Sequence, residues 1–167
     1  MYIRKIAILL LILTCVTVKA QKVVTGSLFP LNTVDKVNFE MEFISIHGMS
    51  EESFGDYEKD WYNDKPGIVG IFSSYANRKL KGHITLGSYP KSDFTVKAVI
   101  NEISIKGDYD CDIVVLDKNK NVIAKISGIT AKGGTWGTKL NLIKDGAETT
   151  GKRFGSVLKS EIIKSKR

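Results

Sequence analysis

The stretch FTVKAVINEISIKGDYDCDIVVLDKNKNVIAKISGIT, residues 94–130, decides the fold class of this 167-residue chain. Apolar and polar residues alternate over 94–100, which is the period-two pattern of a half-buried strand. The alternation changes phase near Asn101, as it does at a β-bulge. Residues 111–116 are apolar on both faces, and the polar run 117–121 is typical of a hairpin loop. We therefore expect three consecutive strands, of which the second is central.

Toward the N-terminus, the pattern predicts three more strands, at residues 22–28, 37–43 and 84–86. In the strand at 37–43, apolar side chains alternate with Asn38, Glu40 and Glu42. After Phe43 the apolar phase slips by one residue, so we expect a bulge or a change of face there.

Two segments have the helical period. Residues 66–81 carry apolar side chains at the i, i+3, i+4 and i+7 positions, with Pro66 at the start and Gly82 after the end. Residues 140–162 repeat apolar side chains every three or four positions and predict a long amphipathic helix, with a break near Asp145 and Gly146. Gly151 and Gly155 lie near its apolar stripe and predict close packing of this helix against the sheet.

The order of elements is strands, a helix, a run of strands and a second helix. It favours an α+β fold, with an antiparallel or mixed sheet of five to six strands and two amphipathic helices packed on one face. We expect a single α+β domain over residues 21–163, followed by a basic tail at 164–167.

The first twenty residues have the pattern of a signal peptide. Arg4 and Lys5 precede an apolar run, and Val18-Lys19-Ala20 places small or modest side chains at the positions that a signal peptidase reads, so we expect cleavage between Ala20 and Gln21. Lipid attachment at Cys15 is the alternative, and it would tether the protein to a membrane. Either route predicts an exported protein, periplasmic or secreted.

Removal of residues 1–20 takes away three cations and lowers the net charge from +7 to +4. This ordinary charge gives no indication of nucleic-acid binding. Cys111 is then the one remaining cysteine, so no internal disulfide is expected and the apolar core must stabilise the fold.

The C-terminal half combines a strand pair (DCDIVVLDKNKNVIAKISG, 110–128), a glycine-rich link (AKGGTWGTKL, 131–140) and a terminal helix (GAETTGKRFGSVLKSEI, 146–162). This combination resembles the small periplasmic or lipoprotein-type α+β envelope domains of Gram-negative bacteria, and is similar to the TolB N-terminal domain or to curli-secretion lipoproteins. The resemblance implies a binding or assembly module and carries no catalytic residues with it.

No motif predicts catalysis, a metal or a cofactor. The glycine-rich segment 128–135 has Gly134 where a phosphate-binding loop needs lysine. Residues 117–128 lack the glycine and glutamate of a calcium loop, and Asp108, Asp110 and Asp112 are typical of a charged strand entry. His47 and His83 have no metal-binding spacing.

Charge and aromatic residues suggest where a partner would bind. Residues 50–64 carry six acids and one base, whereas 151–167 carry six bases and one acid. Aromatic side chains within the acidic segment and in the glycine-rich link are candidate contacts, because aromatics anchor interfaces. The candidate binding residues are Tyr57, Trp61, Tyr62, Gly133, Gly134 and Trp136.

The resulting hypothesis is an exported envelope protein that recognises another envelope protein and performs no catalysis. Peripheral membrane contact stays open as a further role of the basic segment. A small secreted hydrolase with dispersed active-site residues is the alternative. The pattern of residues does not specify an oligomeric state.

Overall fold

The three strands expected from residues 94–130 form the centre of a six-stranded sheet in the computed structural model, which describes residues 22–166. They are β4 (Phe94–Ile103), β5 (Tyr109–Asp117) and β6 (Val122–Ala131), and each is antiparallel to the next. The register between β4 and β5 shifts between Ile100 and Glu102, which confirms the predicted bulge.

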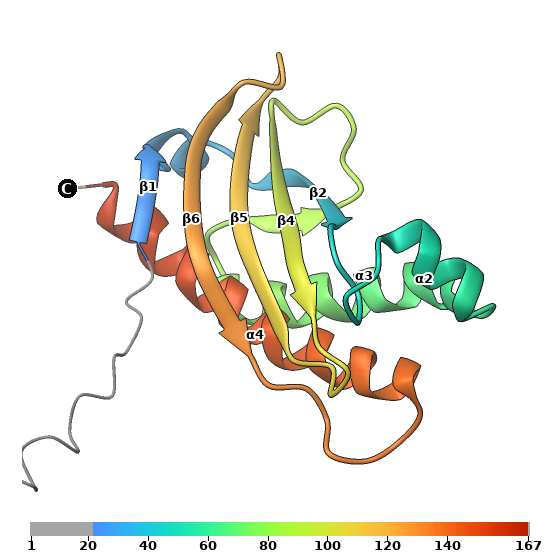
Figure 1. The fold of residues 1–167 in the computed structure, drawn as a ribbon. Coiled ribbons are helices and arrows are strands. Elements are labelled where there is room, and N and C mark those ends of the chain that lie inside the picture. The colour runs from blue at the N-terminus through green and yellow to red at the C-terminus, as the bar shows by residue number, and fades with distance from the viewer. Residues whose placement is uncertain (1–21, 167) are drawn as a thin grey trace, which may run out of the picture.

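Three further strands complete the sheet in the order β1-β6-β5-β4-β2-β3 (Figure 1). β1 (Lys22–Gly26) pairs antiparallel with β6, whereas β2 (Lys36–Phe43) is parallel to both β4 and β3 (Thr85–Gly87). The sheet is therefore mixed, and the predicted α+β class with five to six strands is confirmed. The phase slip after Phe43 coincides with the end of β2, although backbone bonds to β4 continue beyond it: Ile44 N donates to Ile100 O at 2.9 Å, and Ile46 bridges to Ile103.

A short 3-10 helix and three α-helices join the strands. They are η1 (Phe29–Thr33), α2 (Glu51–Tyr57), α3 (Trp61–Leu80) and α4 (Lys139–Lys164). The two long helices, α3 and α4, lie side by side behind one face of the sheet (Figure 1). They run in the same direction, since Asp64 contacts Lys144 near their starts and Ala76 lies against Gly155 further along.

Aromatic side chains fill the space between the sheet and the helices. Phe39 of β2 stacks on Phe72 of α3 with ring centroids 5.8 Å apart, and Phe154 of α4 meets both rings edge-on. A second group joins Phe43, Trp61 and Phe54 edge-to-face, at 5.2 and 5.3 Å. Such pairs add to the apolar burial that drives folding.

The start of α3 differs from the prediction. The helix begins at Trp61, and Pro66 lies inside it. Proline lacks the N–H that would bond four residues back, but burial of the Trp61 ring stabilises this first turn. The indole Nε1 also donates to Glu51 Oε1 at 3.1 Å.

The predicted break in α4 is absent, because the helix is continuous from Lys139 to Lys164. Gly146 is needed for packing: a Cβ there would lie within 3.0 Å of Gly107 O and the Tyr109 ring. Gly151 and Gly155 do mark a close approach, but to the backbone of α3 and not to the sheet. Helix-to-helix contact therefore explains both glycines.

No helix within residues 22–166 has the length and apolar character needed to cross a membrane. The predicted signal peptide, its cleavage site at Ala20 and Gln21, and Cys15 lie outside the described residues.

Candidate functional site

Several chain segments converge at one end of the sheet, where β4 ends and β5 begins. They are the β2–α2 connection (44–50), the β4–β5 turn (104–108), the β6–α4 connection (132–138) and the last residue of α2, Tyr57; we call this region the loop end (Figure 1). Backbone bonds tie the segments together. His47 N donates to Ile103 O at 2.7 Å, and Gly133 N donates to Asp108 Oδ1 at 2.8 Å.

The β4–β5 turn is packed tightly between its neighbours. Gly107 has a φ of +74°, and a Cβ on it would lie within 3.0 Å of Leu142 O in α4. Gly133 approaches the backbone of Lys106 equally closely. The buried Tyr109 hydroxyl donates to Ile143 O at 3.1 Å, and burial raises the pKa of Tyr109, so it stays a donor. These contacts fix the loop end against α4.

Two adjoining hollows open at the loop end. The larger encloses about 500 Å³ and the second about 490 Å³, and they share Glu102, Ser104 and Asp108 in their walls. Charged groups of both signs line the larger hollow, including Asp110, Lys132 and Arg153. The second hollow adds His47, Ile105 and Lys106. The region is concave, and its exposed lining is mainly apolar with charged groups of both signs in the walls.

Exposed apolar side chains belong to the same segments. Trp136 is 88% exposed, Ile105 70% and Tyr57 59%, and Ile44 is also exposed. The Nζ of Lys139 lies 4.0 Å from the centroid of the Tyr57 ring and also donates to its hydroxyl. This contact brings α2 beside the β6–α4 connection that holds Trp136, although the two segments are about eighty residues apart in the chain.

The structure therefore brings together some of the predicted binding residues and separates others. Tyr57, Gly133, Gly134 and Trp136 belong to the loop end. Tyr62 is exposed beside it, with its ring against Gly55. Trp61 is fully buried and cannot form part of a contact surface, because its ring is a core residue between Phe43 and Phe54.

Sequence reasoning missed Ile44, Ile105 and Lys139. Ile105 is an apolar residue in a polar turn, and Ile44 follows the phase slip after β2. Both features are visible in the sequence and could have indicated exposed apolar side chains. Lys139 had no such signal, because only the fold brings it to Tyr57.

His47 is a titratable residue at the loop end. Its side chain is partly exposed, and its pKa is shifted. Its backbone φ is +54°, and its ring packs edge-on to Phe54 at 5.1 Å. Burial and then the charge of Lys139 lower its pKa, against the opposing influence of Glu102 and Glu58. Burial and Lys139 therefore favour the neutral form of the imidazole.

The cysteine and the aspartates are structural. Cys111 is fully buried in β5, and burial raises its pKa, so the thiol is not a nucleophile. Asp108 accepts from Gly133 N, and Asp112 pairs with Lys125 at 3.0 Å. Within residues 22–166, no group of three His, Cys, Asp or Glu side chains could hold a metal ion.

Asp117 and the following residues form the hairpin turn that was predicted. Its carboxylate accepts the backbone N–H groups of Asn119 and Asn121, at 2.8 and 2.9 Å. These hydrogen bonds, with that from the Asn121 side chain first, lower the pKa of Asp117.

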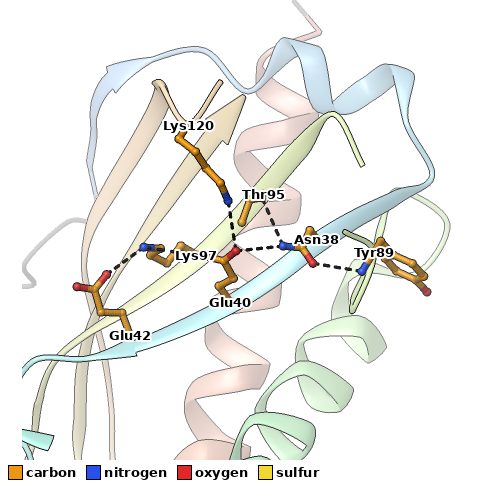
Figure 2. Close-up of polar contacts among 7 residues, drawn as sticks. All are labelled: Asn38, Glu40, Glu42, Tyr89, Thr95, Lys97 and Lys120. Atoms are coloured by element: carbon orange, nitrogen blue, oxygen red, sulfur yellow. Dashed lines mark hydrogen bonds and ion pairs between the residues drawn. The ribbon is translucent and has the colours of Figure 1, made fainter. Parts of the chain in front are cut away.

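The sheet face opposite the helices carries a polar network between β2, β4 and the β5–β6 hairpin (Figure 2). Lys97 pairs with Glu42 at 3.1 Å, and Lys120 reaches Glu40 at 3.4 Å. Further hydrogen bonds join Asn38 to Glu40, to Thr95 and to the backbone of Tyr89. Because its charges are paired with one another, the network ties the parallel strands together and offers little to a charged partner.

The fold and the loop end thus define a class: an α+β protein with helices on one face of a mixed sheet and exposed apolar side chains around two hollows that have charged residues in their walls. The chain matches no protein-family model and no curated protein. Among solved structures it is similar to the PelC dodecamer from Paraburkholderia phytofirmans, with a TM-score of 0.46, 10% identity, and 84% of this chain and 96% of that chain covered.

It is also similar to protein XCC0632 from Xanthomonas campestris, of the family DUF330, with a TM-score of 0.41, 10% identity, and 87% of this chain and 94% of that chain covered. At these TM-scores neither likeness carries an argument about function. The resemblance to the TolB N-terminal domain or to curli-secretion lipoproteins is not confirmed.

Proposed function

We propose that the protein is exported and acts by binding another protein of the cell envelope through the loop end. The observation that carries the proposal is the set of exposed apolar side chains, Trp136, Ile105 and Tyr57, on segments that are tied to α4. Large apolar groups in water cost free energy that a partner would recover by covering them, at about 25 cal/mol per Å². Exposed aromatic side chains beside a concave, mainly apolar surface with charged groups around it are typical of protein interfaces.

The mechanism is recognition without chemistry. Trp136 and Tyr57 would supply the apolar contact, and the charged walls of the two hollows would supply orientation. Export is supported by the signal-type pattern of residues 1–20, and it predicts that the protein recovered from the envelope fraction begins at Gln21.

The test is capture from an envelope extract by protein expressed from the full-length gene and purified after its own processing. A Tyr57→Ala/Trp136→Ala variant should lose the partner that the unchanged protein captures. The matched control is Phe29→Ala/Val122→Ala, which removes two side chains that are 55% and 57% exposed and lie outside the loop end. Circular dichroism checks that each variant is folded.

Loss of capture in the loop-end variant alone supports the proposal. The proposal would be refuted if the loop-end variant and the control variant captured the partner equally well. It would also be refuted if the unchanged protein captured no reproducible partner at low or high salt. The secreted-hydrolase alternative would then be tested by activity screens, with Glu102 and Asp108 as the first residues to substitute because both line the two hollows.

A further inference from the structure

Charge is separated along the helical layer of the molecule. Residues 50–64, from α2 to the first turn of α3, carry six acids and one base, and Lys65, Lys139 and Lys144 lie beside them, so this end keeps a surplus of acids. Bases gather at the other end of the layer, at the end of α3 (Arg78 and Lys79, followed by Lys81) and in the second half of α4. Because α3 and α4 run in the same direction, both C-termini lie at this basic end.

The two ends are too far apart to neutralise each other. Lys139, at the start of α4, contacts Tyr57 of the acidic helix, whereas Lys159 lies twenty residues further along α4. At 1.5 Å per residue this separation is about 30 Å. The Debye length at physiological salt is about 8 Å, so each end presents its own charge to the solvent.

Some of these charged side chains form no ion pair within the described residues. Glu51 and Asp64 form ion pairs with Lys65 and Lys144. Glu52, Asp56 and Asp60 are exposed, and within residues 22–166 none of them forms an ion pair.

The basic end shows the same surplus. Lys152 and Lys164 pair with glutamates on α4, whereas Lys79, Lys81 and Lys159 have no carboxylate partner among the described residues. Helix dipoles favour acids in a first turn and bases in a last turn, but the effect fades beyond one turn and does not account for Asp56 or Lys159.

We propose that the acidic end of one copy binds the basic end of a second copy, so that the chains associate head to tail. The patch around Glu52 and Asp56 and the patch around Lys79 and Lys159 are complementary in sign, unpaired and on opposite ends of one molecule. Such a contact is heterologous: each copy uses both patches, so it builds a ring or an open chain. The inference uses charges on the helices and is independent of the function proposed for the loop end.

The experiment is sedimentation velocity over a range of concentrations, with protein expressed from the full-length gene and purified after its own processing. The average mass should rise with concentration at about 0.1 M salt and fall at about 1 M salt, where the Debye length drops from about 10 to about 3 Å. This measurement needs no variant, and a monomer at every concentration in the lower salt would overturn the inference.

Two charge-reversal variants make the test specific. Glu52→Lys/Asp56→Lys reverses two charges of the acidic patch, and Lys79→Glu/Lys159→Glu reverses two charges of the basic patch. Each alone should associate at least about tenfold more weakly than the unchanged protein. An equimolar mixture of the two should associate more strongly than either alone, because the lysines introduced in one variant then face the glutamates introduced in the other.

The control Lys91→Glu/Lys118→Glu changes the net charge as much as the basic-end variant but lies away from both patches, on exposed loop residues. It should associate like the unchanged protein; weakening equal to that of the basic-end variant would show a net-charge effect and overturn the inference. Failure of the mixture to associate more strongly than either variant alone would do the same. Binding of anionic vesicles to the basic end, by a protein that stays monomeric, would also overturn the inference, because the patch would then recognise lipid.

Discussion

Replacing Gly155 by alanine tests the packing of the two long helices most directly. In an exposed helix this change should stabilise the fold, because alanine has a helix propensity better than that of glycine by about 1 kcal/mol. At Gly155 the new Cβ would lie 2.3 Å from Ala76 O of α3, whereas ordinary contact begins at 3.4 Å. Packing and propensity therefore predict opposite signs.

The magnitude follows from the distance that the helices must move. Relief of the clash requires α3 and α4 to separate by about 1 Å, a gap that removes a quarter to a half of the dispersion energy of the atoms concerned. The Phe72 and Phe154 rings, 5.1 Å apart across this contact, would be among them. Overpacking of this kind costs about 1–3 kcal/mol, and we expect Gly155→Ala to be destabilising by that amount.

Gly70→Ala is the matched control, because Gly70 lies inside α3 with nothing within 4 Å of an added Cβ. It should stabilise the fold by up to about 1 kcal/mol. Urea and thermal unfolding followed by circular dichroism measure both changes, and each kcal/mol corresponds to about 2–4 °C in Tm for a chain of this size. A stabilising effect of Gly155→Ala as large as that of Gly70→Ala would show that the helices are not in close contact, and the reasoning would be wrong.

Three further predictions follow from burial and charge. Cys111 should resist thiol reagents in the native protein and react fully in denaturant, because burial raises its pKa; fast labelling of the folded protein would contradict this. Phe154→Ala should cost about 3–5 kcal/mol in the free energy of unfolding, whereas Trp136→Ala should change it by less than about 0.5 kcal/mol; comparable urea midpoints for the two would count against the assigned core. His47 should titrate below its ordinary pKa of 6.5, so that on acidification the unfolded state binds the proton first and stability falls as the pH drops through 6.5; an NMR titration midpoint at or above 6.5 would oppose this.

Much of the sheet could be predicted from local patterns. The strands around the 117–121 hairpin and the bulge near Asn101 follow from period-two alternation and turn residues, which act between neighbours in the chain. The long helix α4 was predicted for the same reason, although Gly146 was interpreted as a break. Gly146 is required because it lies in close contact with the β4–β5 turn, about forty residues away in the sequence.

The candidate site was predicted in part. Tyr57, Tyr62 and Trp136 were chosen because aromatics anchor interfaces, and all three are exposed. Trp61 was chosen on the same argument and is buried. The aromatic argument could not separate Trp61 from Tyr57; only the fold does so, because α2 ends at the exposed Tyr57 and Trp61 begins α3 with its ring in the core.

Alternation, helical period and turn residues were thus enough for the α+β class and for most strands, because these signals depend on residues close in the chain. Parallel pairing of β2 with β4, the helix-to-helix contact at Gly155 and the meeting of Tyr57 with Lys139 depend on residues tens of positions apart. Such contacts form only when burial of one shared core brings distant segments together. The loop end exists for that reason. The acidic and basic segments are visible in the sequence, but their placement at opposite ends of the helical layer depends on the parallel packing of α3 and α4.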